Sequence, residues 1–180
     1  MSAERQPIRV ISLVVLPNAD GVMHAVQVMA ATRENPQGFH RLIGGGVVFG
    51  ETTRDAAVRE VREELGADLS KPVLLGVLES KFEVDRVPAH EIAFVYTGRL
   101  DPSNTVPPEG GMFADNGLPM AVEWRHLDDP HGSIPLYPSG SGALAWQAVA
   151  AAPRVLEPSP SRVESSHSWR GSAQRGNLKT

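Results

Sequence analysis

The hydrophobic residues of this chain fall into short stretches separated by turn residues, a pattern typical of strands joined by tight connections. The crowding of Val, Ile and Leu over 9–16 predicts a strand that Pro17 ends. Residues 18–21 combine Asn, Asp and Gly, which favour a hairpin turn, so a partner strand is expected over 22–30. We expect further strands over 40–43, 73–84, 90–99 and 120–125, with a long loop rich in Pro and Gly over 100–119.

Two segments have the periodicity of helices. Residues 53–65 contain neither Gly nor Pro, and Thr52 is suited to cap the first turn with Asp55 answering it. Gly66 stands where a left-handed C-terminal cap is expected. The side chains divide into an apolar arc and an adjoining acidic arc: Ala57, Val58, Val61 and Leu65 against Glu60, Glu63 and Glu64. With a second helix over 141–152, this order of elements predicts an α/β protein with a mixed sheet and helices on its faces.

The composition indicates one domain followed by a polar tail. The chain has 180 residues, of which 41% are hydrophobic, enough for one core. After residue 152 the sequence is dominated by Ser, Pro, Gly and scattered basic residues, so we expect a domain over 1–152 and a disordered polar tail over 153–180. The net charge is −4 and the acidic excess lies in the domain, which argues against binding of a nucleic-acid polymer.

The same counts disfavour several classes of protein. The chain contains no Cys, so it has no disulfide framework, thiolate metal site or cysteine nucleophile. Its longest apolar runs are far too short to span a bilayer, and its N-terminus shows no secretory leader. We therefore expect a soluble cytoplasmic protein without membrane association. The sequence leaves the oligomeric state open, with a homodimer formed through an exposed strand as one option.

The glutamates of the first helix carry the strongest chemical signal. Glu60 and Glu64 are four residues apart and stack on one helical face, and Glu63 lies near enough to join them. Like charges so placed, toward the negative end of the helix dipole, destabilise a bare helix. A hard divalent cation removes that penalty, and Mg²⁺ suits a site completed by waters and substrate phosphates. Arg59 is placed to hold one of the carboxylates in position.

The spacing of residues around this helix resembles the Nudix box of the Nudix hydrolases. Gly45 is followed after five residues by Glu51 and after seven more by the run Arg59-Glu60-Val61-Arg62-Glu63-Glu64-Leu65-Gly66. The likeness is close over 45–67 and looser over the flanking strands, where HRLIGGGVVFGE, HEIAFVYTGRL and VEWRHLDD are similar to strands of small bacterial-type members. It implies an α/β/α sandwich with a mixed β-sheet and a catalytic helix after the Gly-rich loop.

The resemblance also implies a reaction, the metal-assisted attack of water on a phosphoanhydride bond that joins a nucleoside diphosphate to a second group, X. It implies that Glu60 and Glu64 are the principal ligands of Mg²⁺, with Mn²⁺ as an alternative metal. Glu63 would be a third ligand or the residue that polarises the water. The remaining box residues would orient the carboxylates or shape the backbone: Arg59 and Glu51 for the first role, Gly45 and Gly66 for the second. The expected catalytic residues are therefore Arg59, Glu63 and Glu64, and the expected partner is a small nucleotide-type molecule.

Residues outside the box are expected to complete the site. Members of the family often use one more carboxylate from a varying position, for which the candidates are Glu91, Glu109 and Asp115, with Glu123 a weaker one. Arg33 and Arg41 could contact phosphate. A flat side chain could stack on a base, and the options are Phe39, Phe82, Tyr96 and Phe113.

Three other interpretations fit less well. The glycines at 45 and 50 resemble a P-loop only in part, because Glu51 stands where that motif requires Lys. A metal-dependent isomerase on the same fold would need His and Cys ligands, and Cys is absent. A non-catalytic domain that binds or senses a nucleotide is the main alternative, although the box glutamates that such a domain would lose are all present. Oxidised nucleoside triphosphates, ordinary nucleotides, ADP-ribose and dinucleoside polyphosphates all stay open as substrates.

Overall fold

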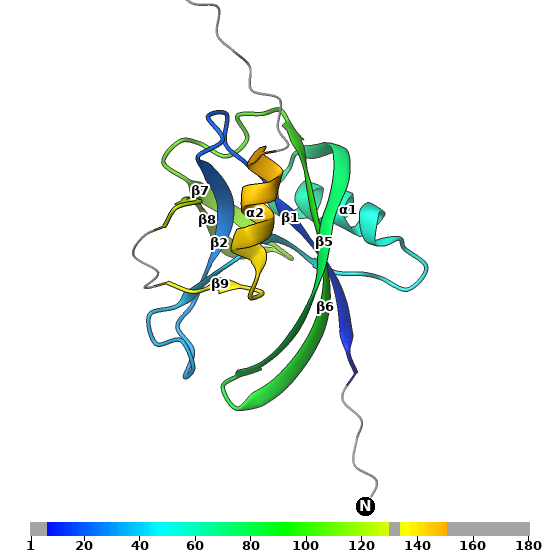
Figure 1. Cartoon of the computed structure of the whole chain (residues 1–180), viewed down its shortest axis with the longest axis vertical. Coiled ribbons are helices and arrows are strands. Elements are labelled where there is room, and N and C mark those ends of the chain that lie inside the picture. Colours follow the sequence, from blue (N-terminus) through cyan, green and yellow to red (C-terminus); the bar gives the residue numbers. More distant parts are fainter. Residues whose placement is uncertain (1–6, 130–133, 151–180) are drawn as a thin grey trace, which may run out of the picture.

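The computed structural model describes residues 7–129 and 134–150. The predicted tail over 153–180 and the last two residues of the predicted second helix lie outside the described residues. Within the described part, two β-sheets lie side by side and two helices pack on them (Figure 1). Neither of these helices has the length and apolar character that crossing a bilayer would require.

Both sheets are mixed. The first has the strand order β4 (Ile43–Gly46), β1 (Arg9–Val15), β6 (Val87–Asp101), β5 (Asp68–Val84). The second has the order β7 (Gly111–Asp115), β8 (Leu118–His126), β2 (Met23–Met29), β3 (Phe39–Arg41), β9 (Leu136–Tyr137). The pairs β1–β6 and β3–β9 are parallel, and the other neighbouring strands are antiparallel. The predicted α/β architecture with mixed sheets is confirmed.

Strand β1 is buried on both faces and separates two core clusters. Ile11 and Leu13 belong to the cluster that includes Leu144 of helix α2 (Ser141–Ala150). Val14 belongs to the other cluster, with Val61 of helix α1 (Thr53–Leu65). Because neighbouring residues of a strand point to opposite faces, this alternation places the first sheet between the two helices. In Figure 1, α2 crosses in front of β1 while α1 lies beyond β5.

Helix α1 begins and ends where the sequence predicts. The Thr52 hydroxyl accepts a hydrogen bond from the backbone N–H of Asp55 at 3.1 Å and donates one to the Asp55 carboxylate at 2.7 Å. Gly66 adopts the left-handed conformation, with φ of +68°, and its N–H donates to the carbonyl oxygen of Arg62 at 3.0 Å. Both caps satisfy backbone groups that the helix leaves unpaired, so the helix ends are set by local sequence.

Three connections differ from the prediction. The stretch expected as one strand over 40–43 is split at Leu42, because β3 pairs in the second sheet and β4 in the first. The predicted loop over 100–119 is wrong in its second half, where β7 and β8 form a hairpin through Asn116 and Gly117, with φ of +48° and +79°. Asn-Gly is a strong hairpin signal that the surrounding prolines and glycines obscured. Strand β9 was not predicted, since two residues carry no periodicity.

Strands β5 and β6 form a long hairpin that extends beyond the body of the molecule (Figure 1). Both are longer than the predicted strands, and register shifts near the start of β5 bend it there. At the turn, Asp85 and Arg86 both have left-handed φ, of +50° and +70°. The hairpin therefore ends in a tight turn of the type that matches strand twist, built without glycine.

Candidate active site

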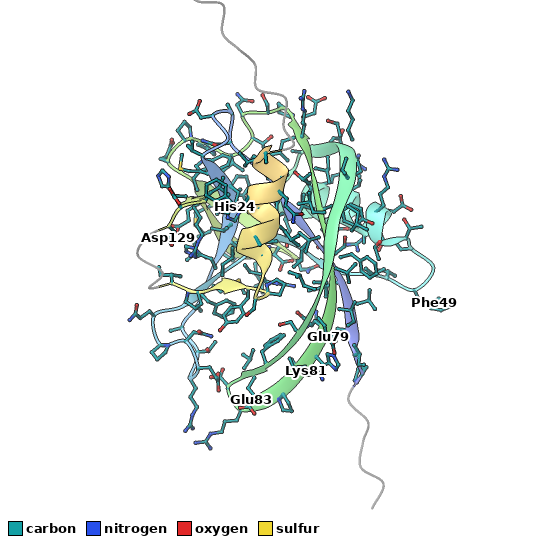
Figure 2. All side chains as sticks on the ribbon, viewed as in Figure 1. His24, Phe49, Glu79, Lys81, Glu83 and Asp129 are labelled. Carbon is teal, nitrogen blue, oxygen red and sulfur yellow. The ribbon has the colours of Figure 1, made fainter. Side chains whose placement is uncertain are left out.

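The glycines before α1 leave room for the glutamates of the helix. At Gly44 the backbone φ is +127°, and a Cβ there would lie 2.2 Å from the carbonyl oxygen of Ser12, so the position requires glycine. At Gly45 a Cβ would lie 2.7 Å from both carboxylate oxygens of Glu60. Phe49, farther along the same loop, projects away from the body and is fully exposed (Figure 2). The glycine backbone thus packs directly against the carboxylates, and only the tip of the loop is open to solvent.

Arg59 connects this loop to the acidic face of α1. Its Nε and Nη2 donate to the two carboxylate oxygens of Glu51, both at 2.9 Å, in a bidentate pair. Nη2 also donates to the carbonyl oxygen of Gly46 at 2.9 Å. Nη1 donates to Glu60 at 2.8 Å and to Glu63 at 2.9 Å. The hydrogen bonds from Arg59 lower the pKa of Glu51, which keeps that carboxylate ionised and holds the guanidinium in place.

Glu64 lies deeper than the other acids of the helix, with 4% of its surface exposed. Its Oε2 accepts a hydrogen bond from the backbone N–H of Gly44 at 2.9 Å, and its Oε1 accepts one from the Gln27 side-chain amide at 2.8 Å. Burial raises the pKa of Glu64 to about 8, and the charges of Glu60 and Asp115 add to this rise. The carboxylate is therefore held in one orientation in a setting that disfavours its negative charge.

Glu60 and Glu63 differ in their access to solvent. Glu60 has 8% of its surface exposed, and burial raises its pKa although the hydrogen bond from Arg59 opposes the rise. The Glu63 side chain is 55% exposed and is bound to Arg59. The acidic face thus combines two buried carboxylates, at positions 60 and 64, with one that water can reach.

Asp115 is the candidate outside the helix that faces this cluster. It ends strand β7, which packs against α1. After burial, which is the main cause, the negative charge of Asp115 contributes to the raised pKa of both Glu60 and Glu64. The hairpin that the sequence did not predict is what carries this third carboxylate to the helix.

The other candidate carboxylates lie in different surroundings. Glu91 has its Oε1 3.2 Å from Nη1 of Arg9. Glu123 has its Oε1 2.9 Å from Nε2 of His40. Glu109 is exposed in the loop before β7. None of these three contacts a box glutamate among the interactions of the described residues.

The side chains of the acidic face that could hold a divalent cation are all carboxylates. Within residues 7–129 and 134–150, no group of three His, Cys, Asp or Glu side chains is already arranged to coordinate a metal ion. Nη1 of Arg59 binds both Glu60 and Glu63, so the guanidinium occupies the space beside these two carboxylates. The chemistry nevertheless fits a hard cation, whose preferred ligands are carboxylate oxygens. Burial raises the pKa of both Glu60 and Glu64, and the neighbouring negative charges add to the rise, so a bound cation would relieve an unfavourable concentration of negative charge.

A cavity of about 330 Å³ opens between the inner face of the β5–β6 hairpin and strands β3 and β9. This volume is within the range of small-molecule sites, about 300–1,000 Å³. Phe39 and Tyr137 line it with their rings edge to face, at a centroid distance of 5.4 Å, and Phe82 lines it from the hairpin. Arg41 also lines the cavity and pairs across the sheet with Gln27, whose side-chain amide donates to Glu64, so one strand pair connects the cavity to the acidic face. The positive charge of Arg41 also lowers the pKa of Glu64, against the larger effect of burial.

Some of the residues predicted to contact the substrate line this cavity, and others lie elsewhere. Phe39, Phe82 and Arg41 line the cavity, whereas Arg33 lies on the loop after β2, where its N–H donates to the Asp85 carboxylate at 3.1 Å. The other two aromatic candidates pack elsewhere: Tyr96 in the core with its hydroxyl 2.8 Å from that of Thr53, and Phe113 against the core cluster beside α1.

Sequence reasoning missed two residues of the site. Gln27, 2% exposed, holds Glu64, and its signal was a lone amide within the apolar stretch over 22–30. Tyr137 lies on the short strand β9 and gave no periodic signal.

The sequence matches the NUDIX domain over residues 7–147. The chain belongs to the Nudix family. The match spans both sheets, both helices except the end of α2, and the whole acidic face, so the chain carries a Nudix hydrolase domain. Nudix hydrolases generally use a divalent metal and act on small nucleotide-type substrates.

Solved structures of bacterial and archaeal proteins share this Nudix fold. A MutT NUDIX hydrolase from Burkholderia pseudomallei is 24% identical, with a TM-score of 0.55 and coverage of 80% of this chain and 99% of that chain. A MutT protein from Methanosarcina mazei Go1 is 18% identical, with a TM-score of 0.53 and coverage of 81% and 96%. A search of curated proteins finds no match. At these identities the likeness shows the fold alone.

Proposed function

We propose that this protein hydrolyses a phosphoanhydride bond in a nucleoside diphosphate linked to a second group X, using Mg²⁺ or Mn²⁺. The observation that carries the proposal is the position of Arg41. Arg41 lines the cavity, and it pairs across the sheet with Gln27, whose side-chain amide donates to Glu64 of the acidic face. A nucleoside in the cavity would therefore extend its phosphates past Arg41 toward the carboxylates.

The residues that would hold the metal are Glu60 and Glu64, with Asp115 or Glu63 completing the set. When bound, Mg²⁺ neutralises charge on the diphosphate oxygens and makes a nearby water more acidic. Burial of Glu60 and Glu64 strengthens such an interaction, because few waters compete for the cation. The bonds from Gly44 and Gln27 hold the Glu64 carboxylate in one orientation.

Other side chains would bind the phosphate, accept the proton of the attacking water and position the carboxylates. Arg41 would bind a non-bridging phosphate oxygen, since a guanidinium matches phosphate geometry. Glu63, the most exposed of the three box glutamates, is placed to accept the proton of the attacking water or to act as a third ligand. Arg59 acts through the carboxylates, because it joins Glu51, Glu60 and Glu63 and so sets their spacing. The expected location of the reaction is the cytoplasm, as predicted from the sequence.

The test is release of phosphate or nucleoside monophosphate from a panel of nucleoside diphosphate derivatives, with and without Mg²⁺. Glu64→Gln removes the charge of the buried carboxylate at nearly constant shape, and we expect kcat to fall about 10³-fold. Glu79→Gln is the matched control, because Glu79 is a 58% exposed acid on the hairpin (Figure 2) and should leave kcat unchanged.

Two results would contradict the proposal. Turnover that does not depend on a divalent metal, or that survives in Glu64→Gln, would remove the acidic face from the reaction. A chain that binds nucleotides, measured as a rise in melting temperature, but turns over no member of the panel would be a nucleotide-sensing Nudix domain.

A further inference from the structure

Glu91 is a buried carboxylate that the proposed reaction does not use. It lies on β6, where its neighbours in the sheet are Arg9 of β1 on one side and Ser80 of β5 on the other. Only 7% of its side chain is exposed, and all three residues line the cavity. The wall of the first sheet thus presents three adjacent polar side chains to a space whose opposite side carries aromatic rings.

The partners of Glu91 leave part of the carboxylate free. Its Oε1 is 3.2 Å from Nη1 of Arg9, whose own side chain is 58% exposed. Within the described part of the chain, Glu91 has no other polar partner. A carboxylate that is nine-tenths buried normally has its oxygens satisfied, because an unmade hydrogen bond costs free energy. The second oxygen of Glu91 is not among the fully buried, unpartnered side-chain atoms of the described residues, and Glu91 lines the cavity, so a ligand there that donates hydrogen bonds can reach it.

The chemistry of the wall narrows the class of that ligand. A carboxylate only accepts hydrogen bonds, an arginine only donates them, and a hydroxyl does both. Glu91 can thus accept two N–H donors that lie side by side, while Ser80 or Arg9 donates to an acceptor next to them. The rings of Phe39 and Phe82 favour a flat ligand.

We propose that Glu91 recognises the edge of a guanine base, accepting its N1–H and its 2-amino group, while Ser80 and Arg9 face the O6 carbonyl oxygen. This assignment rests on the proposed function only in placing the nucleoside in the cavity. It makes Glu91 a specificity-determining residue rather than a metal ligand.

Other bases match the wall less well. Adenine and cytosine each place an unprotonated ring nitrogen beside the amino group, so one carboxylate oxygen would face another acceptor. Uracil has a single N–H between two carbonyl oxygens. Hypoxanthine keeps N1–H and O6 but lacks the 2-amino group, so it isolates one of the two hydrogen bonds. Bidentate pairs of this kind discriminate bases by about tenfold or more.

The experiment measures dissociation constants of GMP, IMP, AMP, CMP and UMP for the full chain by calorimetry with Mg²⁺. Monophosphates contain no phosphoanhydride bond, so binding is measured without the proposed reaction. We expect GMP to bind at least about tenfold more tightly than IMP or AMP. Glu91→Gln should weaken GMP about tenfold and leave AMP within about twofold. Glu79→Gln, an exposed acid on the same hairpin, should change neither.

Equal affinity for GMP and AMP, no binding of any monophosphate, or an unchanged GMP affinity in Glu91→Gln would overturn the assignment. The comparison of GMP with IMP uses the unaltered chain, so it stands even where the variant fails to fold. Selective binding of GMP by a chain that hydrolyses no substrate would leave base recognition intact and reject the proposed hydrolysis.

Discussion

The acidic face of α1 and the cavity beside it are built in opposite ways. Most contacts that hold the acidic face join residues between Gly44 and Glu64, with Gln27 as the distant contributor. The cavity takes its walls from both sheets and from segments between Arg9 and Pro138. The residues of the acidic face therefore come from a short continuous stretch, whereas the residues of the cavity are brought together by the pairing of distant strands.

The acidic face and the cavity also differ in the contacts that hold them together. Arg59 holds the acidic face through a bidentate pair. Beside the cavity, hydrogen bonds join the loop after β2 to the turn of the β5–β6 hairpin, a contact called the clasp here. In this clasp the Glu34 carboxylate accepts hydrogen bonds from the N–H groups of Asp85 at 2.9 Å and Arg86 at 3.3 Å. Both turn residues have left-handed φ, so the clasp stabilises a backbone that other residue types adopt more easily.

Among variants that keep every carboxylate of the acidic face, the largest effect is expected from a methyl group added beside it. Gly45→Ala would place a Cβ 2.7 Å from the Glu60 carboxylate, which must then move. We expect activity to fall about 10–100-fold, with a higher Mg²⁺ concentration at half-maximal rate, because displaced ligands lower metal affinity. Gly46→Ala is the matched control, since a Cβ there meets nothing within 4 Å. Equal losses in both variants would show that loop flexibility, rather than room for Glu60, is what matters.

A smaller effect is expected from opening the clasp of the cavity. Glu34→Gln weakens the hydrogen bonds to the hairpin turn, and we expect KM to rise about two- to fivefold with kcat nearly unchanged. The measurement is steady-state kinetics on the substrate found with the panel. Glu83→Gln removes a charge at the same cavity without touching the clasp. If Glu83→Gln raises KM as much as Glu34→Gln does, negative charge at the cavity, rather than the clasp, determines how tightly the substrate binds.

The smallest effect is a change of stability with pH in the metal-free protein. Burial raises the pKa of Glu64 from 4.5 to about 8, so its contribution to stability is present at low pH and is lost as pH rises toward 8. Burial lowers the pKa of His24 from 6.5 to about 4, so its contribution is lost as pH falls below 6.5. Between pH 6.5 and 8, therefore, the contribution of Glu64 to stability changes with pH, whereas that of His24 does not.

In EDTA we therefore expect the melting temperature to fall by a few degrees from pH 6.5 to pH 8, and Glu64→Gln to remove most of this fall. Glu79→Gln should keep the slope of the unaltered chain. A Glu64→Gln protein with the same slope would assign the pH dependence to other groups.

The helix and its caps could be predicted because they depend on neighbours in the sequence. Thr52, Gly66 and the three-to-four-residue spacing of the glutamates act within one or two turns. The division of residues 39–46 between two sheets could not be predicted, since a single residue, Leu42, separates strands whose partners lie elsewhere in the chain.

The acids outside the helix show the same limit. Asp115 and Glu91 were equal candidates in the sequence, Glu91 at the start of a predicted strand and Asp115 in the predicted long loop over 100–119. The hairpin of β7 and β8 turns Asp115 toward α1, whereas the parallel pairing of β1 with β6 sets Glu91 beside Arg9 in the cavity. Strand register decides this, and register follows from packing over the whole sheet.

By itself, then, the sequence determined the acidic face of this protein: a capped helix, its glutamates, the arginine that binds them and the glycines that make room. These features follow from local geometry, in which a fixed rise per residue brings positions 60 and 64 together. Tertiary structure alone decided which third carboxylate faces the helix, and which rings and polar groups line the cavity. Those choices depend on strand pairings between distant segments, whose free energy comes from burial of the common core.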